Sequence, residues 1–176
     1  MSQDITHLQY PVGKVAIPEQ ITSEMRETFI RQIEQFPSQL HKACLELKSK
    51  HLLETPYRPE GWSGRQVIHH VADSHMNALI RFKLALTEEN PTIKPYKENL
   101  WAQLPDCKNL NPEVSVNIII GVHQKLSAVL RSMNDSDFSR TYYHPESKRT
   151  FRLDQGLALY DWHCRHHLAH LHLILK

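Results

Sequence analysis

The chain has little glycine, little cysteine and no long apolar run: its 176 residues include 5 glycines and 3 cysteines. So few glycines disfavour a turn-rich β-fold or a glycine-rich phosphate-binding loop, because both need backbone with positive φ. The cysteines lie far apart and form no CxxC pair, so we expect reduced thiols and a cytoplasmic protein. No apolar run reaches the roughly 18 residues of a membrane span, and no signal peptide is recognisable at the start.

Strong net charge and the common catalytic motifs are also missing. The formal net charge is +2 with neutral histidine and the basic residues are scattered, so we expect neither a nucleic-acid nor a membrane partner. The sequence contains no HExxH, Glu-x-x-His, P-loop, GxGxxG or GxSxG pattern. These absences argue against a zincin, a di-iron bundle, a nucleotide-binding loop and an α/β-hydrolase nucleophile.

Helical periodicity dominates what is present. Residues 1–22 lack it and predict an extended N-terminal arm that lies on the body. Four long segments show apolar residues at spacings of three and four, at about residues 23–47, 63–89, 112–133 and 154–176. A short helix over 98–104 and a hairpin or ordered loop over 141–153 are also expected. The pattern predicts an all-α fold, an antiparallel four-helix bundle, in a single domain over residues 1–176.

Three local signals mark the helix boundaries. Pro37 should kink the first helix or start a new one, because proline lacks the N–H of the helical hydrogen bond. Ser63 and Gln66 form a capping box at the start of the second helix. Asp154 is the expected N-cap of the last helix.

The most unusual feature is the number of histidines, which is 13. On a helical wheel, His163 and His167 fall inside the apolar stripe of the last helix, whereas His166 and His170 lie toward its edge and His172 points away. Residues four apart project to one side of a helix, so His163 and His167 could share one metal ion. The competing interpretation is that each buried ring simply hydrogen-bonds a carbonyl or carboxylate.

A third ligand would have to come from another helix. The second helix offers His69, His70 and His75. The wheel places His75 nearest the centre of its apolar stripe, His70 at the margin and His69 facing away. Periodicity alone therefore ranks His75 first and His70 second.

Four segments carry a resemblance to a known family: residues 62–77 (WSGRQVIHHVADSHMN), 80–84 (IRFKL), 142–145 (YYHP) and 159–170 (LYDWHCRHHLAH). They resemble the YfiT-like metal-dependent hydrolases of the DinB-like superfamily, which also includes bacillithiol S-transferases. The resemblance implies a four-helix bundle, usually a homodimer, that binds one zinc or nickel ion. It also implies that the ligands are His70, His163 and His167, with His75 as the fallback.

Such a site allows three functions. A three-histidine ion could activate water for hydrolysis of a small-molecule substrate, or hold a low-molecular-weight thiol for S-transfer, or merely clamp the bundle. Hydrolysis calls for a nearby carboxylate, and Asp73 and Asp161 are candidates. S-transfer calls for a basic patch, for which the sequence offers Arg65, Arg81, Lys83 and Arg165.

Overall fold

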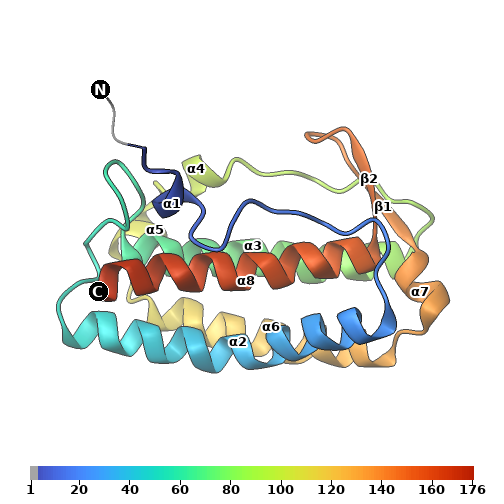
Figure 1. Cartoon of the computed structure of the whole chain (residues 1–176), viewed down its shortest axis with the longest axis horizontal. Helices are drawn as coiled ribbons and strands as arrows, with labels where there is room; N and C mark the ends of the chain where they lie inside the picture. Colours follow the sequence, from blue (N-terminus) through green and yellow to red (C-terminus); the bar gives the residue numbers. More distant parts are fainter. Residues whose placement is uncertain (1–3) are drawn as a thin grey trace.

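The computed structural model describes residues 4–176 and shows a bundle of four long helices (Figure 1). They are α2 (Ser23–Ser49), α3 (Gly64–Thr87), α6 (Glu113–Ser132) and α8 (Leu153–Leu175). The predicted all-α four-helix bundle is confirmed. Helices α2 and α3 each pack against both α6 and α8, so the buried side chains of all four helices form one core. Over residues 4–176, no helix is long and apolar enough to cross a membrane.

The long helices run in two directions (Figure 1). Helices α2 and α8 run one way and α3 and α6 run the other. The connection between α3 and α6 returns along the bundle before α6 begins, so α6 starts at the same end as α3. Each long helix therefore has one antiparallel and one parallel neighbour. Helix α8 lies antiparallel to α3, so the first half of α3 lies beside the second half of α8.

Short elements fill the connections. They are α1 (Thr6–Gln9), α4 (Glu98–Trp101), α5 (Pro105–Asn109), α7 (Asp135–Ser139), β1 (Thr141–His144) and β2 (Arg149–Arg152). The hairpin expected over 141–153 is confirmed, with Tyr142 paired to Phe151. The short helix expected over 98–104 is α4, which ends earlier, at Trp101, and a further helix, α5, follows with Pro105 at its N-terminal turn.

The predicted capping box of α3 is confirmed. Ser63 Oγ accepts a hydrogen bond from the Gln66 N–H at 3.3 Å, and Gln66 Oε1 accepts one from the Ser63 N–H at 3.1 Å. The predicted cap of α8 at Asp154 is wrong. Strand β2 runs directly into α8, so Arg152 is the N-cap residue and its N–H is bound by the Gln155 side chain at 3.2 Å.

Pro37 does not start a new helix, which was one of the two outcomes expected there, because α2 continues across it. Proline has no N–H to offer the carbonyl four residues back, so the Ile33 carbonyl loses its helical partner. His123 of α6 occupies that place, with its Nδ1 2.6 Å from the Ile33 oxygen. The sequence signal therefore marks a contact between two helices rather than a break.

The N-terminal arm lies along α8, as predicted. The Trp162 indole N–H donates to the Gly13 carbonyl at 3.0 Å, and His170 Nε2 lies 3.2 Å from the Gln9 carbonyl oxygen. The arm contains the one-turn helix α1 and is otherwise irregular. It covers a side of α8 that would otherwise face solvent (Figure 1).

Candidate metal centre

The structure brings the three predicted ligands together. His70 lies on α3, and His163 and His167 lie one turn apart on α8. One ring nitrogen from each lies within 4.8 Å of the other two, and the His163 and His167 ring centroids are 4.4 Å apart. A separation below this limit allows three nitrogens to bind one ion at about 2.1 Å each after small side-chain shifts. The spacing of four on α8 and the antiparallel packing against α3 create the cluster.

Burial keeps these three imidazoles in their neutral form. It lowers the pKa of His70 to about 4, and it lowers the pKa values of His163 and His167 well below the ordinary value of 6.5. Neighbouring histidines add to the effect, because each would repel a positive charge on the next. A neutral imidazole has a free lone pair, so the donor set suits zinc or nickel at neutral pH.

The cluster opens onto a cavity of about 370 Å³. The cavity lies between α3, α8, the arm, the α2–α3 loop and α4, and its wall residues are Gln9, Tyr10, Tyr57, Arg58, Glu60, Gly61, Trp62, His70, Glu98, Asn99, Trp162, His163, His166, His167 and His170. The three candidate ligands are thus reachable by a small molecule and are not sealed in the core.

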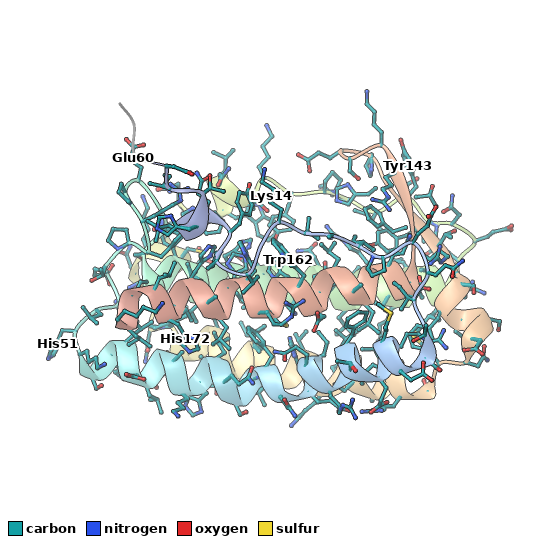
Figure 2. All side chains as sticks on the ribbon, viewed as in Figure 1. Lys14, His51, Glu60, Tyr143, Trp162 and His172 are labelled. Atoms are coloured by element: carbon teal, nitrogen blue, oxygen red, sulfur yellow. The ribbon has the colours of Figure 1, made fainter. Side chains whose placement is uncertain are left out.

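Two tryptophans shape the cavity walls. Trp62 directly precedes the capping box of α3, so the start of that helix fixes both its ring and His70, whose centroids are 4.6 Å apart. Trp162 lies on the side of α8 that faces the arm, and Glu60 lies in the loop beside α1 (Figure 2). The Trp162 ring stacks on His166 at 4.2 Å.

Of the other two histidines of α3, His75 is buried as the helical wheel predicts, and His69 departs from the wheel. His75, ranked first by periodicity, is fully buried as expected, but it lies behind His163 and does not line the cavity. His69, expected to face away, is buried against α6, where Ser115 Oγ lies 2.7 Å from its Nδ1. The wheel fails for His69 because α3 is covered on two sides, by α6 and by α8.

The remaining histidines of α8 show the effect of the arm. His166 and His170, placed at the stripe edge by the wheel, are 7% and 1% exposed because the arm covers them. His172 is exposed, as predicted. Besides the triad, residues 4–176 contain two further groups whose ligand atoms lie within 4.8 Å of one another: His75, His123 and Cys164, and also His166, His167 and His170.

The carboxylates proposed from sequence are not at the cavity. Asp161 pairs with Arg165 at 2.6 Å, and Asp73 lies beside Cys107, with 3.8 Å between the Asp73 carboxylate and the thiol sulfur. Among residues 4–176, the carboxylates on the cavity wall are Glu60 and Glu98. Although Glu98 as a whole is exposed, partial burial of its carboxyl group raises its pKa, and the nearby Glu146 raises it further.

The proposed basic patch is also dispersed. Arg65 pairs with Glu54 at 2.7 Å, and Lys83 is exposed. Arg81 donates to the Tyr160 hydroxyl at 3.0 Å and lines a smaller neighbouring cavity. The arginine on the main cavity wall is Arg58, which sequence reasoning missed along with Glu98. Arg58 belongs to the irregular connection between α2 and α3, and Glu98 to the first turn of the short helix α4. In such segments apolar periodicity does not predict which way a side chain points.

Comparison of the chain with known proteins shows the family to which it belongs. The model of the DinB superfamily matches residues 32–171. The chain belongs to the DinB superfamily. Within it, the chain is 49% identical over 169 residues to a protein of Bacillus cereus (strain B4264) named "Putative metal-dependent hydrolase", with 96% of each chain covered. It is 44% identical over 165 residues to YfiT of Bacillus subtilis (strain 168), which carries the same description, with 94% and 92% covered.

Solved structures also match the fold. YfiT from Bacillus subtilis, described as "a probable metal-dependent hydrolase with an unusual four-helix bundle topology", matches with a TM-score of 0.91, covering 96% of this chain and 95% of that one. A mycothiol-dependent maleylpyruvate isomerase matches with a TM-score of 0.66 at 20% identity, covering 83% of this chain and 60% of that one. The second match shows a shared fold alone.

Proposed function

We propose that this DinB-superfamily protein is a divalent-metal-dependent hydrolase in which His70, His163 and His167 hold one ion, zinc in preference to nickel. The observation that carries the proposal is the meeting of three neutral imidazoles, with donor atoms within 4.8 Å, at an accessible cavity. Structural zinc sites usually have four protein ligands, whereas catalytic sites have three and an open position. The relatives' names support the same chemistry.

When bound, such an ion makes a coordinated water acidic near neutral pH and polarises a substrate oxygen. The chain's own residues complete the site. Glu98 on the cavity wall accepts the proton that a water nucleophile gives up. Arg58 offers a guanidinium to an anionic or strongly polar part of the substrate. The Trp62 ring packs over His70 and His167, so it shields the candidate ligands from bulk water.

The cavity favours hydrolysis over S-transfer. A cofactor thiol that carries several carboxylates needs a basic lining, but among the described residues the groups on this wall that are charged at neutral pH are Arg58, Glu60 and Glu98. Two carboxylates and one guanidinium suit a neutral or singly charged substrate better than a polyanionic thiol.

The test is a metal-dependent activity screen. Purified protein is reconstituted with Zn²⁺ or Ni²⁺ and assayed against chromogenic esters, amides and phosphate esters, with and without low-molecular-weight thiols. We expect thiol-independent turnover that chelation abolishes and re-added metal restores. Glu98→Gln should lower kcat about 10²–10⁴-fold, the usual contribution of a general base. Glu60→Gln is the matched control, because it neutralises the other wall carboxylate, and it should stay near wild type.

Two results would contradict the hydrolase proposal. Turnover that needs a thiol and an electrophilic acceptor would make the protein an S-transferase. A chain that binds metal, unfolds on chelation and turns over no substrate would make the ion a structural clamp. The homodimer and the cytoplasmic location also remain proposals, and light scattering after size-exclusion chromatography tests the first of them.

A further inference from the structure

Two chains of histidine rings lead away from the candidate ligands, and each chain ends at a main-chain carbonyl. The first runs from His163 through His75 to His123, with 3.1 Å between His163 Nδ1 and His75 Nε2 and 2.9 Å between His75 Nδ1 and His123 Nε2. The second runs from His167 to His170, with 3.4 Å between their Nδ1 atoms. The proposed reaction makes no use of His75, His123 or His170.

The proton position on His123, at the far end of the first chain, is fixed by its hydrogen bond. His123 Nδ1 lies 2.6 Å from the Ile33 carbonyl oxygen, which can only accept a hydrogen bond, so His123 carries its proton on Nδ1. The carbonyl is available because Pro37, four residues on, has no N–H to donate to it. A proline in α2 thus provides the anchor for a ring on α6.

The proton position on His123 fixes the proton positions on the next two rings. A neutral imidazole has one N–H and one lone pair, so His123 Nε2 must accept from His75 Nδ1, and His75 Nε2 must accept from His163 Nδ1. If every donor and acceptor in the chain were exchanged, a lone pair on His123 Nδ1 would face a lone pair on the Ile33 carbonyl oxygen. The rings are neutral because they are buried, at 0% exposure for His75 and 1% for His123, with the Phe36 ring stacked on both.

The second chain likewise fixes the proton position on His167, the other candidate ligand on α8. His170 Nε2 lies 3.2 Å from the Gln9 carbonyl oxygen and therefore carries the proton. The lone pair of His170 Nδ1 then faces His167 Nδ1, which must be the donor. The acceptor at the end of this chain belongs to α1, so the N-terminal arm takes part in orienting the site.

We propose that these two chains set the tautomers of both α8 ligands, so that His163 and His167 carry their protons on Nδ1 and present Nε2 lone pairs to the ion. His75, His123 and His170 are then positioning residues. The proposal rests on the proposed metal site for its effect on metal binding, whereas the tautomers belong to the metal-free fold. It also argues against a second ion at His75, His123 and Cys164, because the lone pairs of both rings already accept hydrogen bonds.

The direct test is ¹⁵N NMR of histidine side chains in the metal-free protein, with signals assigned by single His→Gln variants. We expect His163 and His167 to show a protonated Nδ1 and an unprotonated Nε2, which is the minor tautomer of free histidine in water. A protonated Nε2 on His163 or His167 would overturn the proposal. This readout needs no bound metal, so it stands apart from the test of the metal site itself.

The second test is Zn²⁺ affinity, measured by competition with a chromophoric chelator. His75→Leu removes the acceptor of His163 Nδ1 and should weaken Zn²⁺ binding about 10–100-fold, the usual effect of losing such a partner. His75→Gln offers a carbonyl oxygen near the same place and should restore binding, while exposed His172→Ala should match wild type. Wild-type affinity in His75→Leu would overturn the proposal.

If His75→Leu fails to fold, the second chain provides an equivalent pair. His170→Leu removes the acceptor of His167 Nδ1, whereas His170→Asn supplies an oxygen close to the position of the ring Nδ1. We expect weakened Zn²⁺ binding for the first and recovery for the second. Equal affinity in the two variants would overturn the role assigned to this chain. A wild-type protein that binds no Zn²⁺ would refute the metal site, and the NMR measurement would still decide the tautomers.

Discussion

Asp73 should destabilise the folded protein at neutral pH, and replacing it with asparagine should therefore stabilise it. Its carboxyl group lies between α3 and α5, 3.8 Å from the Cys107 sulfur. Burial, together with the charge of Asp106, raises the pKa of Asp73 from 3.8 to about 6. Burial and the same two carboxylates raise the pKa of the Cys107 thiol to about 12, so the thiol stays protonated.

The size of the destabilisation by ionised Asp73 follows from the rise in its pKa. Each factor of ten in proton affinity is about 1.4 kcal/mol, so a rise from 3.8 to about 6 corresponds to about 3 kcal/mol against the ionised folded state. Asp73 is only partly buried, and solvent screening reduces this to about 1–2 kcal/mol. Because the folded state binds its proton more tightly than the unfolded state, the penalty is fully present above about pH 6. It disappears as the pH falls toward 3.8.

The assay is urea denaturation of wild type, Asp73→Asn and Glu89→Gln at several pH values. Glu89 is exposed, and its replacement makes the same change in net charge, so it is the matched control. We expect Asp73→Asn to gain about 1–2 kcal/mol at pH 7.5, which is about 4 °C in Tm for a chain of this size, and to gain less at pH 4.5. A loss of stability at pH 7.5, or a gain independent of pH, would refute the reasoning.

Three further predictions concern the bundle. Leu40→Ala should cost about 2–5 kcal/mol because the side chain is fully buried, whereas Leu45→Ala on the exposed side of the same helix should change stability by less than about 0.5 kcal/mol. Ser63→Ala should cost about 1 kcal/mol through loss of the capping box. Urea denaturation measures both, and equal costs at residues 40 and 45 would contradict the packing. Chelation should leave the far-UV circular dichroism unchanged, because the helices bury a large core of their own; unfolding would indicate a structural ion.

Much of the fold could be predicted from spacing alone. Apolar periodicity located all four long helices, and the Ser63–Gln66 pattern located the start of α3 to the residue. Of the two outcomes expected at Pro37, the start of a new helix is wrong, because a proline inside a helix is tolerated when another donor takes the freed carbonyl, and that donor lies on α6. Asp154 was misread because a strand leads into α8 without a loop.

The residues of the candidate site could also be predicted only in part from the sequence. The pair His163 and His167 followed from helical spacing, but the choice of His70 over His75 came from family resemblance, because both rings are buried and the wheel cannot tell a cavity from a core. Glu98 and Arg58 could not be found from periodicity, since their positions depend on how irregular connections fold back over α3 and α8.

The central claim is that three histidines from two helices hold one metal ion. Metal content per chain, measured after reconstitution with Zn²⁺ and removal of free ion, tests it most directly in wild type and in the His70→Ala, His163→Ala, His167→Ala and His172→Ala variants. The account predicts one ion per chain in wild type and His172→Ala, and none in the other three while their circular dichroism stays helical. No ion in wild type, or a full complement in any of those three variants, would contradict it.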